Sequence, residues 1–394
     1  MVRCGDGLAV DADVAVAAEA ATRQALLPLG GRSPDLLCVF VCAPDPDDVT
    51  AALERVADVS GAATALGCSA GGVIGAGRGV ERTSAVSVWA GALPGVRLRS
   101  FHLEVLRSSE SIVVVGMPAQ RADDDVGVLL ADPYSFPIDA FVEQANDALP
   151  GLPLVGGLAD GMRGAGSTRL LVDGHVHDRG AAGVVLSGDV SARPIVSQGC
   201  RPVGPAMTVT AADGNVLLGL AGTPAVRKLE EIVAELPPAD QALVTQGLHL
   251  GVAMDEYAEE HGRGDFLVRG VVGAETERDG LVVGDVVEVG RTVRFQVRDA
   301  EAADAELASM LDDVRRSGAI DPVAGALLFS CNGRGGAMFP SADHDVAVVR
   351  SALDTEGVAG FFAAGEIGPV GGRNHLHGFT ASILAFGAAG RARP

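Results

Sequence analysis

The side chains that could bind a ligand or react gather, in the last part of the chain, in two glycine-rich segments. Glycine is favoured where the backbone takes a positive φ or passes close to another group, so such segments suit binding sites. The candidate site residues are Cys331, Asn332, Gly333, Arg334, Gly335, Gly365, Glu366, Arg373, Asn374, His375 and His377. Polar groups of this kind beside apolar runs predict a site for a small molecule.

The first segment, SCNGRG at 330–335, offers two kinds of chemistry. Arg334 could hold a carboxylate or phosphate through two parallel hydrogen bonds. Cys331 could be a nucleophile if Arg334 or the loop amides stabilise its thiolate. The competing interpretation of Cys331 is a small buried core residue, which is the usual role of a cysteine.

The second segment places Glu366 directly after the apolar run FFAA at 361–364. A carboxylate next to a buried strand needs a partner. It could accept from a ligand amine, or it could form a structural salt bridge with Arg334 or Arg373. Both interpretations stay open at the sequence level.

Two His-x-His pairs, at 375–377 and 175–177, place imidazoles on one face of a strand. A metal site needs a third ligand at compatible spacing, and none is visible. The sequence therefore predicts neither a metal nor a cofactor. The pair at 175–177 follows Asp173-Gly174 and is predicted at a hairpin tip.

The elements that must position these residues form a repeat. Segments 36–75, 126–161 and 325–368 each contain an apolar β run, a turn, an amphipathic helix, a second apolar run and a turn of small residues. Further β runs joined by Pro-Gly and Asp-Gly turns follow the first two and predict hairpins. The fold class is α/β, in a mixed α+β form. Repeated strand-helix-strand-hairpin units build mixed sheets layered with helices.

The repeat suggests three parts of the chain. Residues 1–32 form an N-terminal helical segment, 33–222 hold two copies of the unit, and 223–386 hold the third. Before the third copy, a hairpin is predicted over 207–220. Helices are predicted over 225–236 and 301–316, and strands over 248–253, 266–272 and 292–298.

The turns of the first two copies offer less chemistry than those of the third. The turn LGCSAGG at 66–72 contains Cys68 and Ser69 but lacks the GxSxG arrangement of a nucleophile elbow. Asp160, in the second copy, is a candidate helix cap or ligand contact. The glycines recur in all three copies and are largely architectural, whereas the charged and amide side chains belong to the third.

Composition narrows the class of partner. The chain has 394 residues and a formal net charge of −21, which opposes binding to nucleic acid and to anionic membranes. Six cysteines without a CxxC pair indicate reduced thiols. No signal peptide is predicted, and the apolar run 379–390 is too short to span a bilayer. We therefore expect a cytoplasmic protein.

Several segments resemble the FIST family, which combines an N-terminal and a C-terminal FIST domain. The resemblance covers about residues 33–386 and rests most on SCNGRG at 330–335 and on FFAAGEIGPVGGRNHLHGFTASI at 361–383. It also includes LGCSAGGVIG at 66–75, SVWAGALPGV at 87–96, LPLVGGLADG at 152–161 and FLVRGVVGAE at 266–275. The resemblance implies a sensory protein that binds a small ligand. It supplies no catalytic residues.

The leading hypothesis is a bacterial-type, cytoplasmic sensory protein that binds an amino acid or related carboxylate metabolite. Arg334 would meet an anionic group, Glu366 a cationic one, and a downstream signalling protein is a possible partner. One alternative is a thiol-dependent hydrolase or transferase that uses Cys331 with His375 or His377. Another is a protein-interaction module without a ligand. The residue set favours recognition over catalysis, and enzymatic activity stays open.

Overall fold

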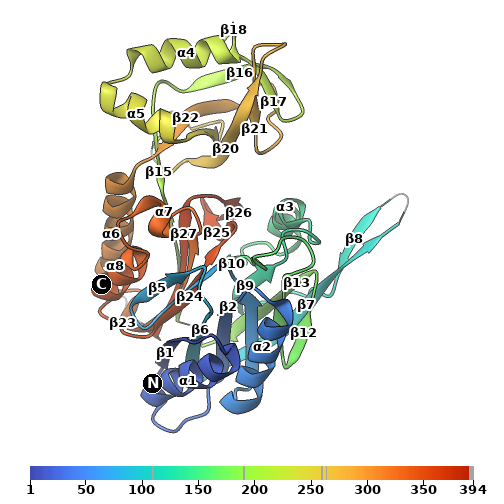
Figure 1. Cartoon of the computed structure of the whole chain (residues 1–394), viewed down its shortest axis with the longest axis vertical. Helices are drawn as coiled ribbons and strands as arrows, with labels where there is room; N and C mark the ends of the chain where they lie inside the picture. The colour runs from blue at the N-terminus through green and yellow to red at the C-terminus, as the bar shows by residue number, and fades with distance from the viewer. Residues whose placement is uncertain (109–110, 190, 259–260, 263, 390–394) are drawn as a thin grey trace. The chain divides into compact units, whose positions relative to one another are not determined.

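The computed structural model describes residues 1–108, 111–189, 191–258, 261–262 and 264–389 (Figure 1). The chain divides into two compact units. Unit 1 comprises residues 1–196, 307–376 and 380 onwards, and unit 2 comprises 197–306 and 377–379. Unit 2 is therefore an insertion within the sequence of unit 1.

Three sheets of mixed strand direction build unit 1. The first has the strand order β1 (Arg3–Val10), β6 (Ala85–Ala92), β2 (Leu36–Cys42), β3 (Thr64–Ser69), β11 (Leu170–Val172) and β12 (His175–His177). The second runs β26 (Arg373–His377), β25 (Glu366–Val370), β10 (Leu154–Leu158), β9 (Asp124–Ala131), β13 (Ala181–Gly188), β7 (Val96–Arg107) and β8 (Ile112–Val115). The third runs β14 (Ala192–Gln198), β27 (Thr380–Ala389), β23 (Ile320–Cys331), β24 (Val358–Ala363), β4 (Gly72–Gly75) and β5 (Arg78–Glu81).

Each sheet has the same three strands at its centre, which confirms the predicted repeat. A parallel pair, β2–β3, β9–β10 or β23–β24, lies beside an antiparallel strand, β6, β13 or β27. A helix crosses over between the two parallel strands: α2 (Pro46–Ser60), α3 (Ile138–Ala148) or α8 (His344–Leu353). The proposed α/β class with mixed sheets is thus the observed one.

The hairpin that ends each copy belongs to a neighbouring sheet. The β4–β5 hairpin of the first copy extends the third sheet, β11–β12 of the second extends the first, and β25–β26 of the third extends the second. The three copies are therefore interlocked in a cyclic order. No copy can complete its sheet without another, so unit 1 should fold as one body.

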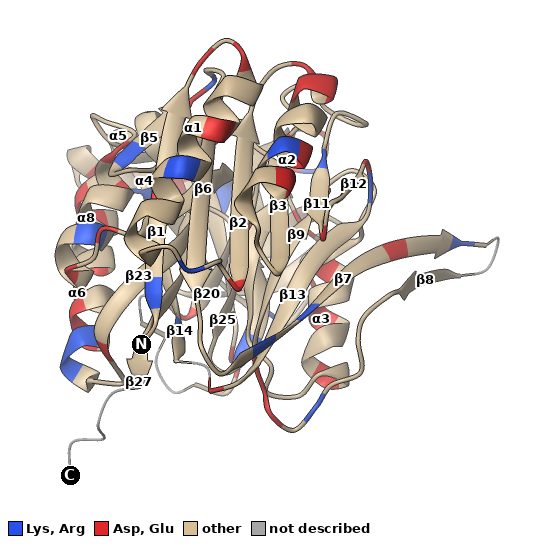
Figure 2. Cartoon of the chain, turned by 90° about the horizontal axis from the view of Figure 1, so that it is seen from below, with Lys and Arg blue, Asp and Glu red and all other residues tan. Residues whose placement is uncertain are grey.

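The core follows from the two faces of these sheets. One cluster contains side chains from all three sheets, including Phe40, Phe329 and Phe361, whose rings contact one another. The opposite faces pack against helices: the first sheet against α1 (Val14–Leu26) and α2, the second against α3, and the third against α6 (Ala300–Ser317) and α8. Figure 2 shows α1 and α2 side by side, with charged residues on the helices and few on the strands beneath.

Helix starts follow local sequence signals. Asp45 is the N-cap of α2 and accepts from the Asp47 amide at 2.9 Å, while Pro46 occupies the first turn. Asp13 caps α1 in the same way. In the segment 1–32, predicted to be helical, strand β1 precedes α1, and a short 3-10 turn, η1 (Leu27–Leu29), follows it.

Two of the predicted hairpins are wrong. The Pro94-Gly95 turn connects β6 to β7, yet β6 pairs with β1 and β2 in the first sheet, and β7 pairs with β13 in the second. The second wrong hairpin joined the runs 182–186 and 194–197. These runs lie in β13 and β14, which belong to different sheets. A tight turn is a local signal, whereas tertiary packing decides which strand the next strand pairs with. The hairpin at Asp173-Gly174 is confirmed, with Val172 opposite His175.

Unit 2 has its own mixed sheet and core. Its strands are β15 (Cys200–Pro202), β22 (Thr292–Arg298), β16 (Met207–Asp213), β17 (Val216–Leu220), β18 (Thr223–Pro224), β21 (Gly280–Val283), β20 (Phe266–Glu275) and β19 (Leu248–Ala253), with helices α4 (Ala225–Glu235) and α5 (Pro238–Gln246). The strands and helices predicted for this section are confirmed, while α5 was not predicted. The boundary predicted near Gly222 lies within unit 2.

The remaining helix, α7 (Gly335–Met338), is a single turn after β23. Among the described helices, none is both long and apolar enough to cross a membrane.

Candidate functional site

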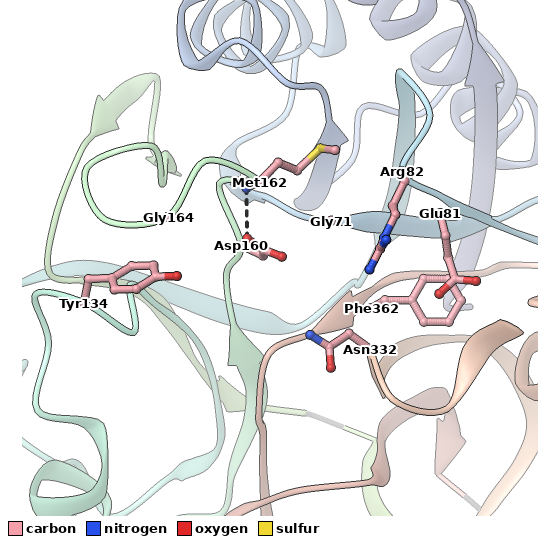
Figure 3. Close-up of a pocket in the computed structure, with 9 residues that line it drawn as sticks. All are labelled: Gly71, Glu81, Arg82, Tyr134, Asp160, Met162, Gly164, Asn332 and Phe362. Carbon is pink, nitrogen blue, oxygen red and sulfur yellow. Dashed lines mark hydrogen bonds between the residues drawn. The ribbon is translucent and has the colours of Figure 1, made fainter. Parts of the chain in front are cut away.

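The loops at the carboxyl ends of the parallel strands surround one pocket in unit 1 (Figure 3). Its volume is about 560 Å³, a size suited to a metabolite. Its lining residues come from all three copies: Gly71, Glu81, Arg82, Tyr134, Asp160, Met162, Gly164, Asn332 and Phe362. Ligands of open α/β sheets bind beyond the carboxyl ends of strands, where side chains from several loops can meet.

Arg82 and Asp160 face the same space from different copies. Figure 3 shows Arg82 and Asp160 on different sides of the pocket, with the Asp160 carboxylate pointing into it and the Arg82 guanidinium directed toward Asn332. Within the described part of the chain, no ion pair or hydrogen bond engages the Arg82 side chain. The pocket therefore presents a cation and an anion that a zwitterionic ligand could bind together.

The Asp160 carboxylate is held in place by its own loop. Its Oδ1 accepts from the amide of Met162 at 2.9 Å. A Cβ added at Gly71 would lie 2.8 Å from Oδ2, so a larger residue at this position would make the carboxylate shift. The amide of Asp160 also donates to the carbonyl of Ser69 at 3.2 Å, which joins the loops of the first two copies.

Glu81 and Phe362 line the pocket close to α7. Glu81 ends β5, and its Oε2 accepts from the amide of Gly336 at 3.0 Å. A Cβ added at Gly335 would lie 2.7 Å from Glu81 Oε1 and 3.0 Å from Phe362 Cε1. The carboxylate and the ring edge are thus neighbours, and each can contact one ligand group.

The remaining lining is partly apolar. Met162 lies against Cys42, with 3.7 Å between the two sulfur atoms. Burial raises the pKa of the Cys42 thiol to about 11, so this thiol is neutral near pH 7. Tyr134 is 56% exposed and directs its ring toward the pocket, as Figure 3 shows. A ligand could therefore place an apolar portion against Met162 and Tyr134.

The structure places the predicted Arg334 in the interior, where it is fully buried. Its Nε and Nη2 donate to the two carboxylate oxygens of Asp345 at 2.8 and 2.9 Å. Asp345 also accepts from the Ser330 hydroxyl at 2.6 Å. Burial works against the charge of Asp345, but Arg334 and these hydrogen bonds hold the pKa of its carboxyl well below the usual range. Arg334 thus fixes the loop that carries Asn332.

Glu366 is also fully buried, at the start of β25 and not in a turn. Its Oε2 accepts from the amide of Thr380 at 3.1 Å. Burial raises the pKa of this carboxyl well above its ordinary value, and a hydrogen bond from the Cys331 thiol offsets the rise in part. Burial therefore favours the neutral form of this carboxyl.

The last predicted residues spread over β26. Asn374 is buried and ties β26 to the second copy: its Oδ1 accepts from the Leu154 amide at 2.7 Å, and its Nδ2 donates to the Leu152 carbonyl at 2.9 Å. Arg373 is exposed, 3.9 Å from Asp147. His375 is half-buried in the same strand, while His377 is buried and belongs to unit 2.

The structure thus brings together only part of the predicted set. Cys331, Arg334 and Glu366 are neighbours inside unit 1, where Cys331 Sγ accepts from the Gly333 amide at 3.5 Å. Gly333 and Gly335 shape the same loop. Gly365 accepts from the Leu158 amide at 2.8 Å. Among the predicted residues, Asn332 lines the pocket. In the described part of the chain, no three His, Cys, Asp or Glu side chains are arranged to hold a metal ion.

Sequence reasoning singled out Asn332 and Asp160 but missed most other pocket residues. Glu81 ends β5 and Arg82 follows it, and β5 is joined through β4 to β24, which lies far away in the sequence. The repeat contained a usable signal, because equivalent turns in interlocked copies must end near one another. Had all three copies been weighed equally, the turns around Gly71, Tyr134 and Asp160 would have been included.

Comparison with known proteins agrees with this architecture. The FIST N domain model matches residues 35–223, and the FIST C domain model matches residues 225–369. The chain belongs to the FIST family. FIST domains are associated with sensory and signalling functions. An uncharacterized protein of Mycobacterium tuberculosis is 42% identical over 385 residues, which cover 98% of this chain and 100% of the relative. An uncharacterized protein of Mycobacterium bovis is 40% identical over 387 residues, covering 98% of this FIST protein and 99% of the relative.

Proposed function

We propose that this FIST protein is a cytoplasmic sensor that binds an amino acid or a closely related zwitterionic metabolite. The observation that carries the proposal is that Arg82 and Asp160, a cation and an anion from different copies, line one pocket of about 560 Å³. Arg82 would take the ligand carboxylate in a bidentate hydrogen bond, and Asp160 would accept from the ammonium group. Binding would then be passed to a downstream signalling protein.

In this proposal Arg82 and Asp160 bind the anionic and cationic ligand groups, the roles that the sequence suggested for Arg334 and Glu366. Nε and Nη2 of Arg334 already donate to Asp345, and its Nη1 is buried without a partner among the described residues. Burial raises the pKa of the Glu366 carboxyl well above its ordinary value, which disfavours the charge that would attract an ammonium group. Asn332 keeps its predicted role, because its amide lines the pocket and can bond either ligand group.

A thermal-shift screen of the purified chain against the common amino acids tests the proposal. A ligand present at 100 times its dissociation constant should stabilise the folded state by roughly 2.7 kcal/mol. Arg82→Gln and Asp160→Asn should each abolish the shift. Asparagine can still accept from the Met162 amide, so the second variant should keep the loop intact.

Arg78→Gln is the matched control, since Arg78 lies at the other end of β5, is exposed, and does not line the pocket. The control should respond to ligand like the unmodified protein. The proposal fails if no amino acid raises the melting temperature, or if Arg82→Gln responds as strongly as Arg78→Gln.

A further inference from the structure

The charged residues that line the pocket favour a narrower class of ligand than zwitterions in general. Its acidic and basic lining residues are Glu81, Arg82 and Asp160, two carboxylates and one guanidinium. A neutral amino acid that pairs with Arg82 and Asp160 would leave Glu81 without a ligand cation. A ligand with a second positive charge would balance all three.

The surroundings of Glu81 suit a cation. Its carboxylate and the edge of the Phe362 ring both approach the same point above Gly335, at 2.7 and 3.0 Å. Cations bind favourably to carboxylates. The edge of an aromatic ring carries partial positive charge, so here Glu81 supplies the attraction and Phe362 only an apolar contact. Asn332, from the neighbouring loop, also lines the pocket, and its side-chain oxygen accepts from the Cys331 thiol at 3.8 Å.

Glu81 is also held in place without being neutralised. Its Oε2 accepts from the Gly336 amide, and within the described residues no Lys, Arg or His side chain forms an ion pair with it. Gly335 and Gly336 lack side chains, which leaves the carboxylate accessible from the pocket. A fixed anion with a free oxygen lowers the ordering cost of binding a cation.

We propose, resting on the proposed function, that this pocket selects α-amino acids with a cationic side chain, of the lysine and ornithine class. Arg82 binds the α-carboxylate, Asp160 the α-ammonium, and Glu81 the terminal ammonium. The methylene chain lies against Met162 and Tyr134.

Calorimetric titration of the full-length chain with four compounds tests this selectivity: L-lysine, L-ornithine, L-norleucine and L-glutamate. Norleucine has the carbon chain of lysine without the terminal amine, so it isolates the contribution of Glu81. Lysine or ornithine should bind at least roughly tenfold more tightly than norleucine, because one charge-assisted hydrogen bond is lost.

Glu81→Gln should weaken lysine binding to the level of norleucine and leave norleucine binding unchanged. The glutamine oxygen can still accept from the Gly336 amide, so the start of α7 is preserved. Glu143→Gln, an exposed change on α3, is the control and should change neither affinity.

The outcomes separate the two proposals. If norleucine or glutamate binds as tightly as lysine, or if Glu81→Gln weakens lysine and norleucine equally, the selectivity is wrong while the amino acid sensor stands. If none of the four compounds binds and the amino acid screen is also negative, both proposals fail.

Discussion

At the scale of single residues, the interior of unit 1 holds three ionisable groups whose roles depend on their partners. Arg334 and Asp345 are both buried and joined by two hydrogen bonds, which compensates their charges. Glu366 is nearby but shares no ion pair with them among the described contacts, and burial raises the pKa of its carboxyl well above the ordinary value. These groups fix the loop beside the pocket and do not present charge to a ligand.

The buried carboxyl predicts a specific pH dependence. An unfolded glutamate has a pKa of about 4.3. The folded pKa of Glu366 is raised above this unfolded value. The contribution of the Glu366 carboxyl to stability is therefore complete below the unfolded pKa and is lost as pH rises through the folded pKa. Glutamine resembles the protonated form of Glu366. The change in Tm caused by Glu366→Gln should therefore be roughly 1–3 °C more positive at pH 8.5 than at pH 5.

Differential scanning calorimetry at the two pH values measures this difference. Glu54→Gln on the exposed face of α2 is the control and should shift Tm equally at both. A destabilised Glu366→Gln protein at pH 8.5 would show that Glu366 is ionised in the folded state.

At the scale of elements, one glycine recurs in the second parallel strand of every copy. Gly67, Gly156 and Gly360 each pair with a residue of the first parallel strand, Val39, Leu129 and Leu328. A Cβ added at these positions would lie 2.5, 1.9 and 1.7 Å from the carbonyl oxygen of that partner. The close approach of the two strands thus explains why a glycine stands at this place three times.

Gly360→Ala should therefore weaken the third sheet. Because the partner is backbone, the strand must shift, and overpacking of this kind costs about 1–3 kcal/mol. Chemical denaturation with a spectroscopic readout measures the loss. Gly270→Ala is the matched control, since a Cβ at this strand position meets nothing within 4 Å. Equal stability of the two variants would contradict the close approach described for Gly360.

At the scale of the whole molecule, unit 2 interrupts unit 1 between β14 and α6. The interruption begins and ends at neighbouring points, because the amide of Asp299 donates to the carbonyl of Gly199 and β15 pairs with β22. Unit 2 also has a core of its own. A chain in which a short Gly-Ser linker replaces residues 200–298 should therefore fold and keep the pocket.

This excision also exposes Phe379, which packs on His249 and beneath Arg298 within unit 2. Phe379 has a φ of 59°, so Phe379→Asn suits both the solvent and the backbone. The shortened protein should give a cooperative thermal transition and the same amino acid response as the full chain. A loss of cooperative unfolding would show that unit 1 depends on the insertion.

Local patterns in the sequence determined the elements and the repeat. Alternating and continuous apolar runs, caps such as Asp45, and turn residues act over a few positions, so the three strand-helix-strand units and most of unit 2 could be read directly. The sequence also identified Asn332, Asp160 and the family resemblance, because each can be recognised from residues that are close together in the chain.

The tertiary structure decided which turns meet and which charges stay accessible. Arg82 and Glu81 reach the pocket only because the β4–β5 hairpin pairs with β24, almost 300 positions away (Gly360 opposite Ile74). Arg334 and Glu366 looked like a recognition pair, but Arg334 is bonded to Asp345 and both side chains are buried. Strand partners and the electrostatics of buried groups are set by side chains distant in the sequence, and no local pattern records them.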